Sequence, residues 1–201
     1  HEIHVFVPNT YDFVENNEGV IVYFYKSILK MGVAKFSYKL FSDRFNYDFD
    51  IIHVHNDPMS VILGLYYIRR KKVQLVVTWH SDWVPNYGNI IRPALVILAN
   101  KLLPDKILSY ANAITTTTRL FAIRESRFLK KYMDKVYVVP NGINLDEFDI
   151  KYSKEESRKI LGLDKWKYIT ITVGALYLLK GQHILLRAIP EIVKKYENIL
   201  F

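Results

Sequence analysis

Short apolar segments of strand type alternate with longer helix-compatible segments along most of this 201-residue chain. The strand-type segments are residues 1–8, 20–25, 50–55, 73–78, 113–118, 135–139 and 167–173. Residues 73–78 form a nearly continuous apolar run, which is typical of a parallel strand buried on both faces. Strands that alternate with helices are joined by right-handed crossovers, so the pattern predicts an α/β fold with a doubly wound parallel sheet.

The segments between these strands differ in character. Residues 9–19 are polar and turn-rich, and residues 79–88 form an aromatic, polar loop. Asn56, Asp57 and Pro58 combine a helix N-cap with a proline in the first turn, which predicts a helix start. We expect helices over residues 26–46, with Gly32 as a break, and over 58–68, 90–101, 104–110, 119–132 and 182–196.

One stretch marks a boundary between two parts of the chain. A strand stops at Pro140 and is followed by Asn141-Gly142, a dipeptide suited to a tight turn with positive φ. A charged, helix-like segment over 151–159 comes next, and the strand pattern restarts at Lys167. We predict a first domain over 1–150, a linker over 151–166 and the beginning of a second domain over 167–201. A lone strand–helix unit cannot bury its own sheet faces, so we expect residues 167–201 to be poorly stable alone.

Four candidate site residues follow from a rule of open parallel sheets, whose ligands bind beyond the carboxyl ends of the strands. His80 ends a strand and could donate to a substrate hydroxyl or phosphate, or simply be hydrogen-bonded there. Asp82 could accept a hydroxyl hydrogen bond or lie in solvent. Thr118 could contact substrate or cap the next helix, and Asn141 could contact a ligand or serve only a turn.

The segment from Gly174 to Gly181 is the strongest chemical candidate. Gly174 follows a predicted strand, and Lys180-Gly181 opens a predicted helix. Backbone N–H groups and one ammonium at such a place can surround a diphosphate. The order Lys-Gly differs from that of a Walker P-loop, and a plain strand–loop–helix turn with an exposed lysine is the alternative.

A metal site is the less favoured interpretation of a second cluster. His53, His55 and Asp57 alternate and would share one face of a strand end. No further ligand is secured by the sequence, and the chain has no cysteine, which excludes thiolate sites and disulfides. We therefore predict no metal.

Five motifs, taken in order, resemble the retaining glycosyltransferases of family 4, which have the GT-B fold of two Rossmann-like domains. They are Asp50-Ile-Ile-His-Val-His55, Val76-Val-Thr-Trp-His80, the strand over 111–118, the Val-Pro-Asn-Gly-Ile sequence over 139–143, and the strand with a Lys-Gly loop over 171–181. Several motifs in one order are more specific than any single one. The sugar-nucleotide epimerases of the same fold fit the Val-Pro-Asn-Gly-Ile and Lys-Gly pair less well.

The resemblance implies transfer of a hexose from a nucleotide diphosphate sugar to the hydroxyl of a sugar, glycan or lipid-linked acceptor, with retention and without a cofactor or metal. It implies that Gly174, Lys180 and Gly181 hold the diphosphate and that His80 faces the sugar. Many relatives have Arg where this chain has Ala175. The family's glycine-rich loop would precede His1 and its acidic segment would follow Phe201, so we expect no transfer by these 201 residues alone.

The net charge of +8 implies an anionic partner. Basic clusters lie at residues 69–72, 130–131 and 194–195, each at the end of a predicted helix, where a cation favours the helix dipole. No nucleic-acid motif is recognised, and no apolar run approaches the length of a membrane span. We expect a cytoplasmic protein, with peripheral contact to an acidic membrane left open. A non-catalytic basic binding module is the alternative from another functional class.

Overall fold

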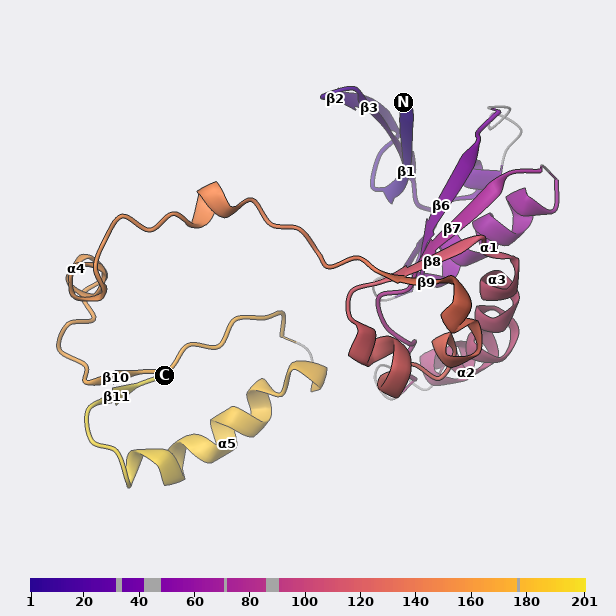
Figure 1. Ribbon diagram of the computed structural model, residues 1–201. Coiled ribbons are helices and arrows are strands. Elements are labelled where there is room, and N and C mark those ends of the chain that lie inside the picture. The colour runs from indigo at the N-terminus through magenta and orange to yellow at the C-terminus, as the bar shows by residue number, and fades with distance from the viewer. Residues whose placement is uncertain (32–33, 42–47, 71, 86–90, 177) are drawn as a thin grey trace. The chain divides into compact units, whose positions relative to one another are not determined.

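The computed structural model describes residues 1–31, 34–41, 48–70, 72–85, 91–176 and 178–201 (Figure 1). The chain forms two compact units, His1–Asn141 and Gly142–Phe201. Each unit is described by itself below.

A four-stranded parallel sheet is the centre of the first unit. Its strands are β6 (Ile51–His55), β7 (Gln74–Thr78), β8 (Ala113–Thr116) and β9 (Val136–Val138), and their order in space is β6-β7-β8-β9. His55 is in register with Thr78, and Thr78 is in register with Thr115. The predicted α/β fold with a parallel sheet is confirmed, and the carboxyl ends of all four strands meet at one edge.

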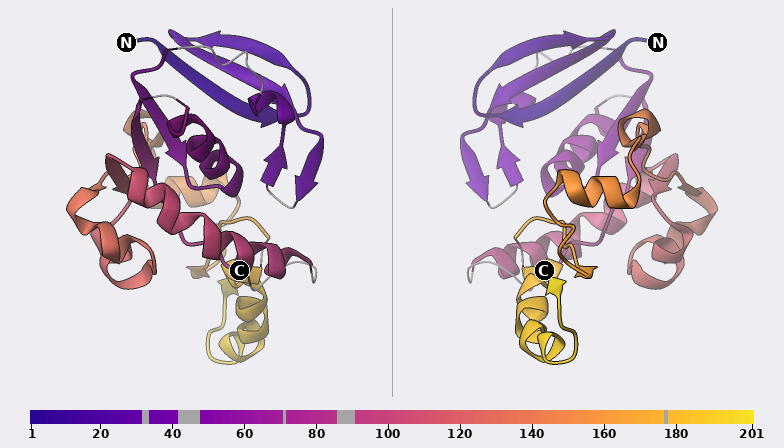
Figure 2. Two further views of the ribbon diagram at one scale, coloured as in Figure 1. Left: turned by 90° about the vertical axis from the view of Figure 1, so that its right-hand side faces the viewer. Right: turned by 90° about the vertical axis from the view of Figure 1, so that its left-hand side faces the viewer.

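Helices cover one face of this sheet. Helix α1 (Pro58–Ile68) packs on β6 and β7, and α3 (Pro104–Tyr110) packs on β7, while α2 (Ile91–Leu102) contacts α3 (Figures 1 and 2). The core between them contains Val54, Leu75, Val77 and Ile114 of the strands with Val61, Leu65, Ile107 and Leu108 of the helices. Strand side chains alternate between faces, so the opposite face carries the more exposed residues, such as Ile51 and Tyr137.

The segment between β8 and β9 is not the single α-helix predicted over 119–132. It forms a π-helical turn, η2 (Phe121–Glu125), and a 3-10 segment, η3 (Leu129–Lys135). Ser126 separates the two because its hydroxyl oxygen accepts hydrogen bonds from the backbone N–H groups of Phe128 and Leu129. This side chain replaces the backbone acceptors of a continuous helix.

The first part of the chain differs most from the prediction. Strand β1 (Ile3–Asn9) lies parallel to β3 (Val20–Lys26), and β2 (Phe13–Asn17) lies antiparallel to β3, so the polar segment predicted over 9–19 contains a strand. The helix predicted over 26–46 is wrong. The chain there forms two antiparallel strands, β4 (Leu29–Met31) and β5 (Ala34–Phe36), and a 3-10 turn, η1 (Tyr38–Phe41), because pairing between strands outweighs a helix-compatible pattern. Gly32 and residues 42–46 lie outside the described residues.

The second unit is small, and none of its described residues is buried. It contains η4 (Leu145–Phe148), α4 (Lys154–Ile160), β10 (Tyr168–Ile169), η5 (Leu178–Lys180), α5 (Gln182–Val193) and β11 (Ile199–Leu200), with β10 and β11 parallel. Only Tyr168 and Ile169 of the strand predicted over 167–173 pair, and Val173 is 88% exposed. Helix α5 has no buried residue.

The boundary between the units is extended. The tight turn with positive φ predicted at Asn141-Gly142 is wrong, since neither residue has a positive φ. Both side chains are exposed and nothing lies within 4 Å of a Cβ added to Gly142. Within the described parts of the chain, no helix combines the length and the apolar character needed to cross a lipid bilayer.

Gly64 permits a close approach of α1 to the sheet. A Cβ added to this residue would lie 2.8 Å from Cγ2 of Val54 and 3.2 Å from Cδ1 of Ile107. Real Cβ atoms do not tolerate the first distance, so an alanine would push α1 away from β6 or distort both neighbours.

We predict that Gly64→Ala lowers the free energy of unfolding by about 1–2 kcal/mol, because overpacking outweighs the better helix propensity of alanine. Urea unfolding followed by tryptophan fluorescence measures this. The matched control is Gly142→Ala, which adds the same methyl group to open space. If Gly64→Ala were as stable as the control, the packing of α1 on β6 described above would be wrong.

Candidate functional site

Three histidines gather at the carboxyl edge of β6 and β7. Nδ1 of His55 lies 2.9 Å from Nε2 of His80, so one ring donates a hydrogen bond to the other. The two rings also stack, with centroids 5.2 Å apart, and the ring of His53 stacks on His55 at 4.9 Å. His80, which was predicted to end a strand, lies two residues beyond the end of β7 at Thr78, and its ring has a histidine partner.

A chain of hydroxyl groups continues from His53 across the exposed face of the sheet. Nε2 of His53 lies 2.6 Å from Oγ1 of Thr78, and that oxygen lies 2.7 Å from Oγ1 of Thr115. The register of β6, β7 and β8 places these residues side by side. A polar ladder thus runs over three strands next to the histidine pair.

The electrostatics of this cluster favour neutral rings at His53 and His55. Desolvation lowers the pKa of His53 below its ordinary value, and the positive charges that His55 and His80 can carry lower it further. Desolvation and His80 likewise lower the pKa of His55, although the carboxylate of Asp57 opposes this shift. Neutral imidazoles keep one lone pair each, so the cluster can both donate and accept hydrogen bonds near neutral pH.

Asn56 holds the backbone of the loop that carries His80. Its side chain is buried, its Oδ1 accepts from the backbone N–H of His80 at 3.0 Å, and its Nδ2 donates to the carbonyl of Ser81. Its backbone N–H donates to the carbonyl of Thr78, and its carbonyl accepts from the indole N–H of Trp83. Sequence reasoning missed this function, although Asn56 belongs to the Asn56-Asp57-Pro58 pattern that predicted the helix start.

Asp57, not Asn56, caps helix α1. Its Oδ1 accepts from the backbone N–H groups of Met59 and Ser60 at 3.0 and 3.1 Å. The predicted N-cap with a proline in the first turn is therefore present, and this role turns the carboxylate toward the helix. Within the described residues, no group of three or more His, Asp or Glu side chains is arranged to hold a metal ion.

Asp82 has a structural role in the same loop. One carboxylate oxygen accepts from the indole N–H of Trp79 at 2.9 Å and from the hydroxyl of Ser126 at 2.8 Å. The other accepts from the backbone N–H of Arg127 at 2.8 Å, and the Arg127 guanidinium lies 3.7 Å away. Both oxygens thus have intramolecular donors, and the substrate contact predicted for Asp82 stays an untested prediction.

Thr118 and Asn141 lie just beyond the ends of β8 and β9, and their hydrogen bonding and exposure differ. Oγ1 of Thr118 accepts from the backbone N–H of Phe121 at 3.2 Å, which is the capping geometry given as its alternative role. Asn141 is exposed and ends the first unit. The substrate contacts predicted for these two residues also stay predictions.

The loop before α5 brings Gly174 and Lys180 together in the second unit. A Cβ added to Gly174 would lie 3.9 Å from Cγ and Cδ of Lys180, and Nε2 of Gln182 donates to the carbonyl of Ala175 at 3.0 Å. Gly181 has φ +74° and is the N-cap of α5, a conformation that favours glycine. Within the described residues, the Lys180 side chain forms no ion pair, so its ammonium is free to meet an anion.

Comparison with known proteins places the chain among glycosyltransferases. A family model described as Glycosyltransferase Family 4 matches residues 1–147. The O-antigen chain mannosyltransferase C of Escherichia coli is 29% identical over 144 residues, which cover 70% of this chain and 35% of that protein. The alpha-monoglucosyldiacylglycerol synthase of Acholeplasma laidlawii is 25% identical over 216 residues, which cover 100% of this chain and 54% of that protein.

The chain therefore spans about a third to a half of the length of these curated relatives. Among solved structures, sucrose-phosphate synthase from Thermosynechococcus elongatus matches with a TM-score of 0.64 and 17% identity, over 100% of this chain and 60% of that chain. At this identity the likeness shows the fold alone.

We predict that Asp82→Ala lowers the free energy of unfolding by about 2–4 kcal/mol, because buried donors of Trp79 and Ser126 lose their acceptor. Chemical denaturation measures the loss. Asp105→Ala is the matched control, since Asp105 forms an exposed ion pair with Lys131, which solvent screens, and its loss should cost much less. Equal losses in the two variants would remove the structural role assigned to Asp82.

The lowered pKa values of His53 and His55 predict a pH dependence of stability. An unfolded histidine titrates near pH 6.5, so below about that pH the unfolded chain binds more protons than the folded one. The contribution of these two histidines to the free energy of unfolding should therefore be fully present above about pH 7. It should fall as the pH drops through about 6.5 and become constant below the lowered pKa values. NMR titration of the ring Cε1 protons gives the two pKa values directly, and midpoints at or above the ordinary value would contradict the prediction.

Proposed function

Because the chain belongs to glycosyltransferase family 4, we propose that its protein transfers a hexose from a nucleotide diphosphate sugar to an acceptor hydroxyl, with retention of the anomeric configuration. The acceptor would be a sugar, a glycan or a lipid-linked molecule. The observation that carries this proposal is the close approach of Gly174 and Lys180 at the N-terminus of α5.

The loop before α5 has the chemistry to hold the donor's diphosphate. The first backbone N–H groups of a helix lack acceptors within the helix, and the helix dipole adds a partial positive charge there. Helix α5 begins at Gln182, and Lys180, whose ammonium forms no ion pair with the part of the chain that the structure describes, lies two residues before it. The bond from Gln182 to the Ala175 carbonyl holds the loop against the helix.

In the proposed reaction, this loop stabilises the leaving nucleotide diphosphate. Negative charge accumulates on the phosphate oxygens as the bond between the transferred sugar and the diphosphate breaks. Lys180 and the backbone N–H groups of the first turn would bind those oxygens more strongly as the charge grows. Stronger binding in the transition state than in the ground state lowers the barrier.

His80 would position the transferred sugar. Its side chain is exposed at the carboxyl edge of the sheet, where a ligand can reach it. The hydrogen bond to His55 orients the ring, and the hydrogen bond that the backbone N–H of His80 donates to Oδ1 of Asn56 fixes the loop. Two supports for one exposed ring favour a role in orienting a substrate.

We expect calorimetric titration of UDP, GDP and ADP into the complete protein to show binding of one nucleotide, and we expect Lys180→Ala to weaken that binding at least about tenfold. The loss corresponds to one charge-assisted hydrogen bond, worth about 1.5–3 kcal/mol.

The matched control is Lys165→Ala, which removes the same charge from an exposed position of the same unit. Retained affinity in this control, with loss in Lys180→Ala, would support the role of the loop. No binding of any of the three nucleotides by a folded, complete protein would overturn the proposed function in favour of a non-catalytic domain.

A further inference from the structure

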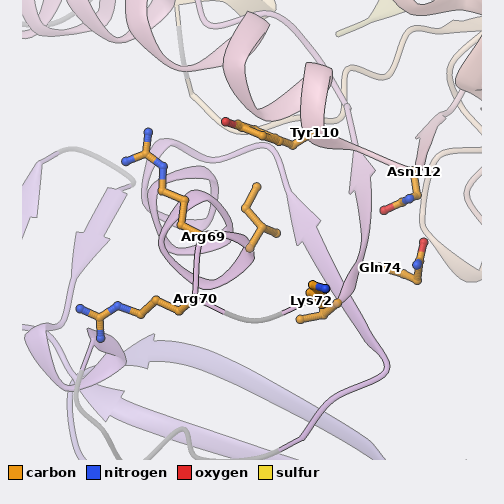
Figure 3. A pocket seen from close by; sticks show the side chains of 8 residues that line it. Arg69, Arg70, Lys72, Gln74, Tyr110 and Asn112 are labelled. Atoms are coloured by element: carbon orange, nitrogen blue, oxygen red, sulfur yellow. The ribbon is translucent and has the colours of Figure 1, made fainter.

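A basic pocket lies at the edge of the four-stranded sheet opposite to the histidine cluster. Figure 3 shows its labelled lining residues, which are Arg69, Arg70, Lys72, Gln74, Tyr110 and Asn112. The arginines follow the C-terminus of α1, Tyr110 ends α3, and Gln74 begins β7. Strand β7 extends about 13 Å from Gln74 at this edge to Thr78, which is in register with His55.

The negative ends of two helix dipoles offset only part of the positive charge that the side chains bring to this pocket. The C-termini of α1 and α3 both end at it, and each contributes at most about half a negative charge. The three cations exceed that, which leaves a net charge of about +2. Within the described residues, no acidic side chain lines the pocket, and Arg69, Arg70 and Lys72 form no ion pair.

The cations differ in their partners. Both arginines extend away from Gln74 and Asn112 in Figure 3, and the guanidinium of Arg70 lies 4.2 Å from the centre of the Tyr66 ring. This cation–π contact fixes Arg70 at the rim, where it raises the local potential. Arg69 and Lys72 have no such partner among the described residues, so they are the cations available to a ligand.

Polar side chains complete the set of donors. Oδ1 of Asn112 accepts from the backbone N–H of Leu75 at 2.9 Å, which fixes the orientation of the amide and leaves the two N–H groups of Nδ2 as donors. Figure 3 shows the amides of Asn112 and Gln74 facing one another on one side of the pocket. The hydroxyl of Tyr110 is a further donor in the lining.

We propose that this pocket binds a phosphate group, as a second anion site separate from the proposed donor site. The guanidinium of Arg69 offers paired N–H groups that match two phosphate oxygens, and Lys72 adds a point charge. The cavity has a volume of about 350 Å³, enough for a phosphate group and part of the molecule that carries it. A soluble phosphate compound and the headgroup of an acidic phospholipid share this chemistry.

The experiment titrates inorganic phosphate and pyrophosphate into the complete protein and follows the side-chain amide signals of Gln74 and Asn112 by NMR. Sedimentation with phosphatidylcholine vesicles, with and without phosphatidylglycerol, tests the lipid source. The test variant is Arg69→Gln with Lys72→Gln. The matched control is Lys101→Gln with Lys106→Gln, which removes two exposed charges from the same unit.

We expect phosphate or pyrophosphate to shift the amide signals of Gln74 and Asn112, and the affinity to fall about tenfold or more in the test variant only. The affinity should also fall as salt is added, because the site is exposed. Binding to phosphatidylglycerol vesicles alone, with the same dependence on the variants, supports the site and assigns the phosphate to a lipid.

Two results would overturn the proposal. One is that neither phosphate, pyrophosphate nor vesicles bind while circular dichroism shows the protein folded. The other is an equal loss in both double variants, which would mean attraction to net charge without a site. Nucleotide binding through Lys180 is read separately, so failure here leaves the proposed function unaffected.

Discussion

The burial of Trp79 connects the core of the first unit to its candidate site. The ring is fully buried, and its indole N–H is bound by Asp82. Its backbone N–H donates to the carbonyl of Thr115 on β8, and its carbonyl accepts from the hydroxyl of Thr116. The next residue is His80. The buried Trp79 ring and the hydrogen bonds to β8 therefore fix the backbone position from which the exposed His80 side chain extends. Loss of the core packing would therefore displace the site.

Much of the first unit's sheet was predictable because its signals are local. Residues 73–78 are apolar enough to be buried, and Asp57 with Pro58 supplies both parts of a helix start. The region of residues 26–41 was not predictable in this way, since β4 and β5 depend on pairing with one another and not on the preference of each segment. Likewise, Ser126 ended a predicted helix through hydrogen bonds of its hydroxyl, which a periodic pattern does not reveal.

The site shows the same division. The rule for strand ends located His80, and the motif sequence led to the family, whose model matches residues 1–147. The hydrogen-bond partners in the site could not be derived from the sequence. Asn56 lies 24 positions from its partner His80, and Asp82 lies 45 positions from its partner Arg127. Spacing along a sequence identifies which strand ends meet, whereas the choice between a ligand contact and an internal hydrogen bond depends on side-chain directions.

The hydrogen bond between His55 and His80 has one further consequence, which concerns a single hydrogen atom. When both rings are neutral, the bond holds one hydrogen between two nitrogens, and each ring has one nitrogen left outside it. If His55 owns the shared hydrogen, Nδ1 of His80 carries the other and can donate; if His80 owns it, Nδ1 of His80 is an acceptor. In either arrangement the pair offers one outer donor and one outer acceptor. Conversion of one neutral arrangement into the other moves the shared hydrogen, removes the hydrogen from Nδ1 of His80 and adds one to Nε2 of His55. A hydroxyl group, which both donates and accepts, can match the pair in both states.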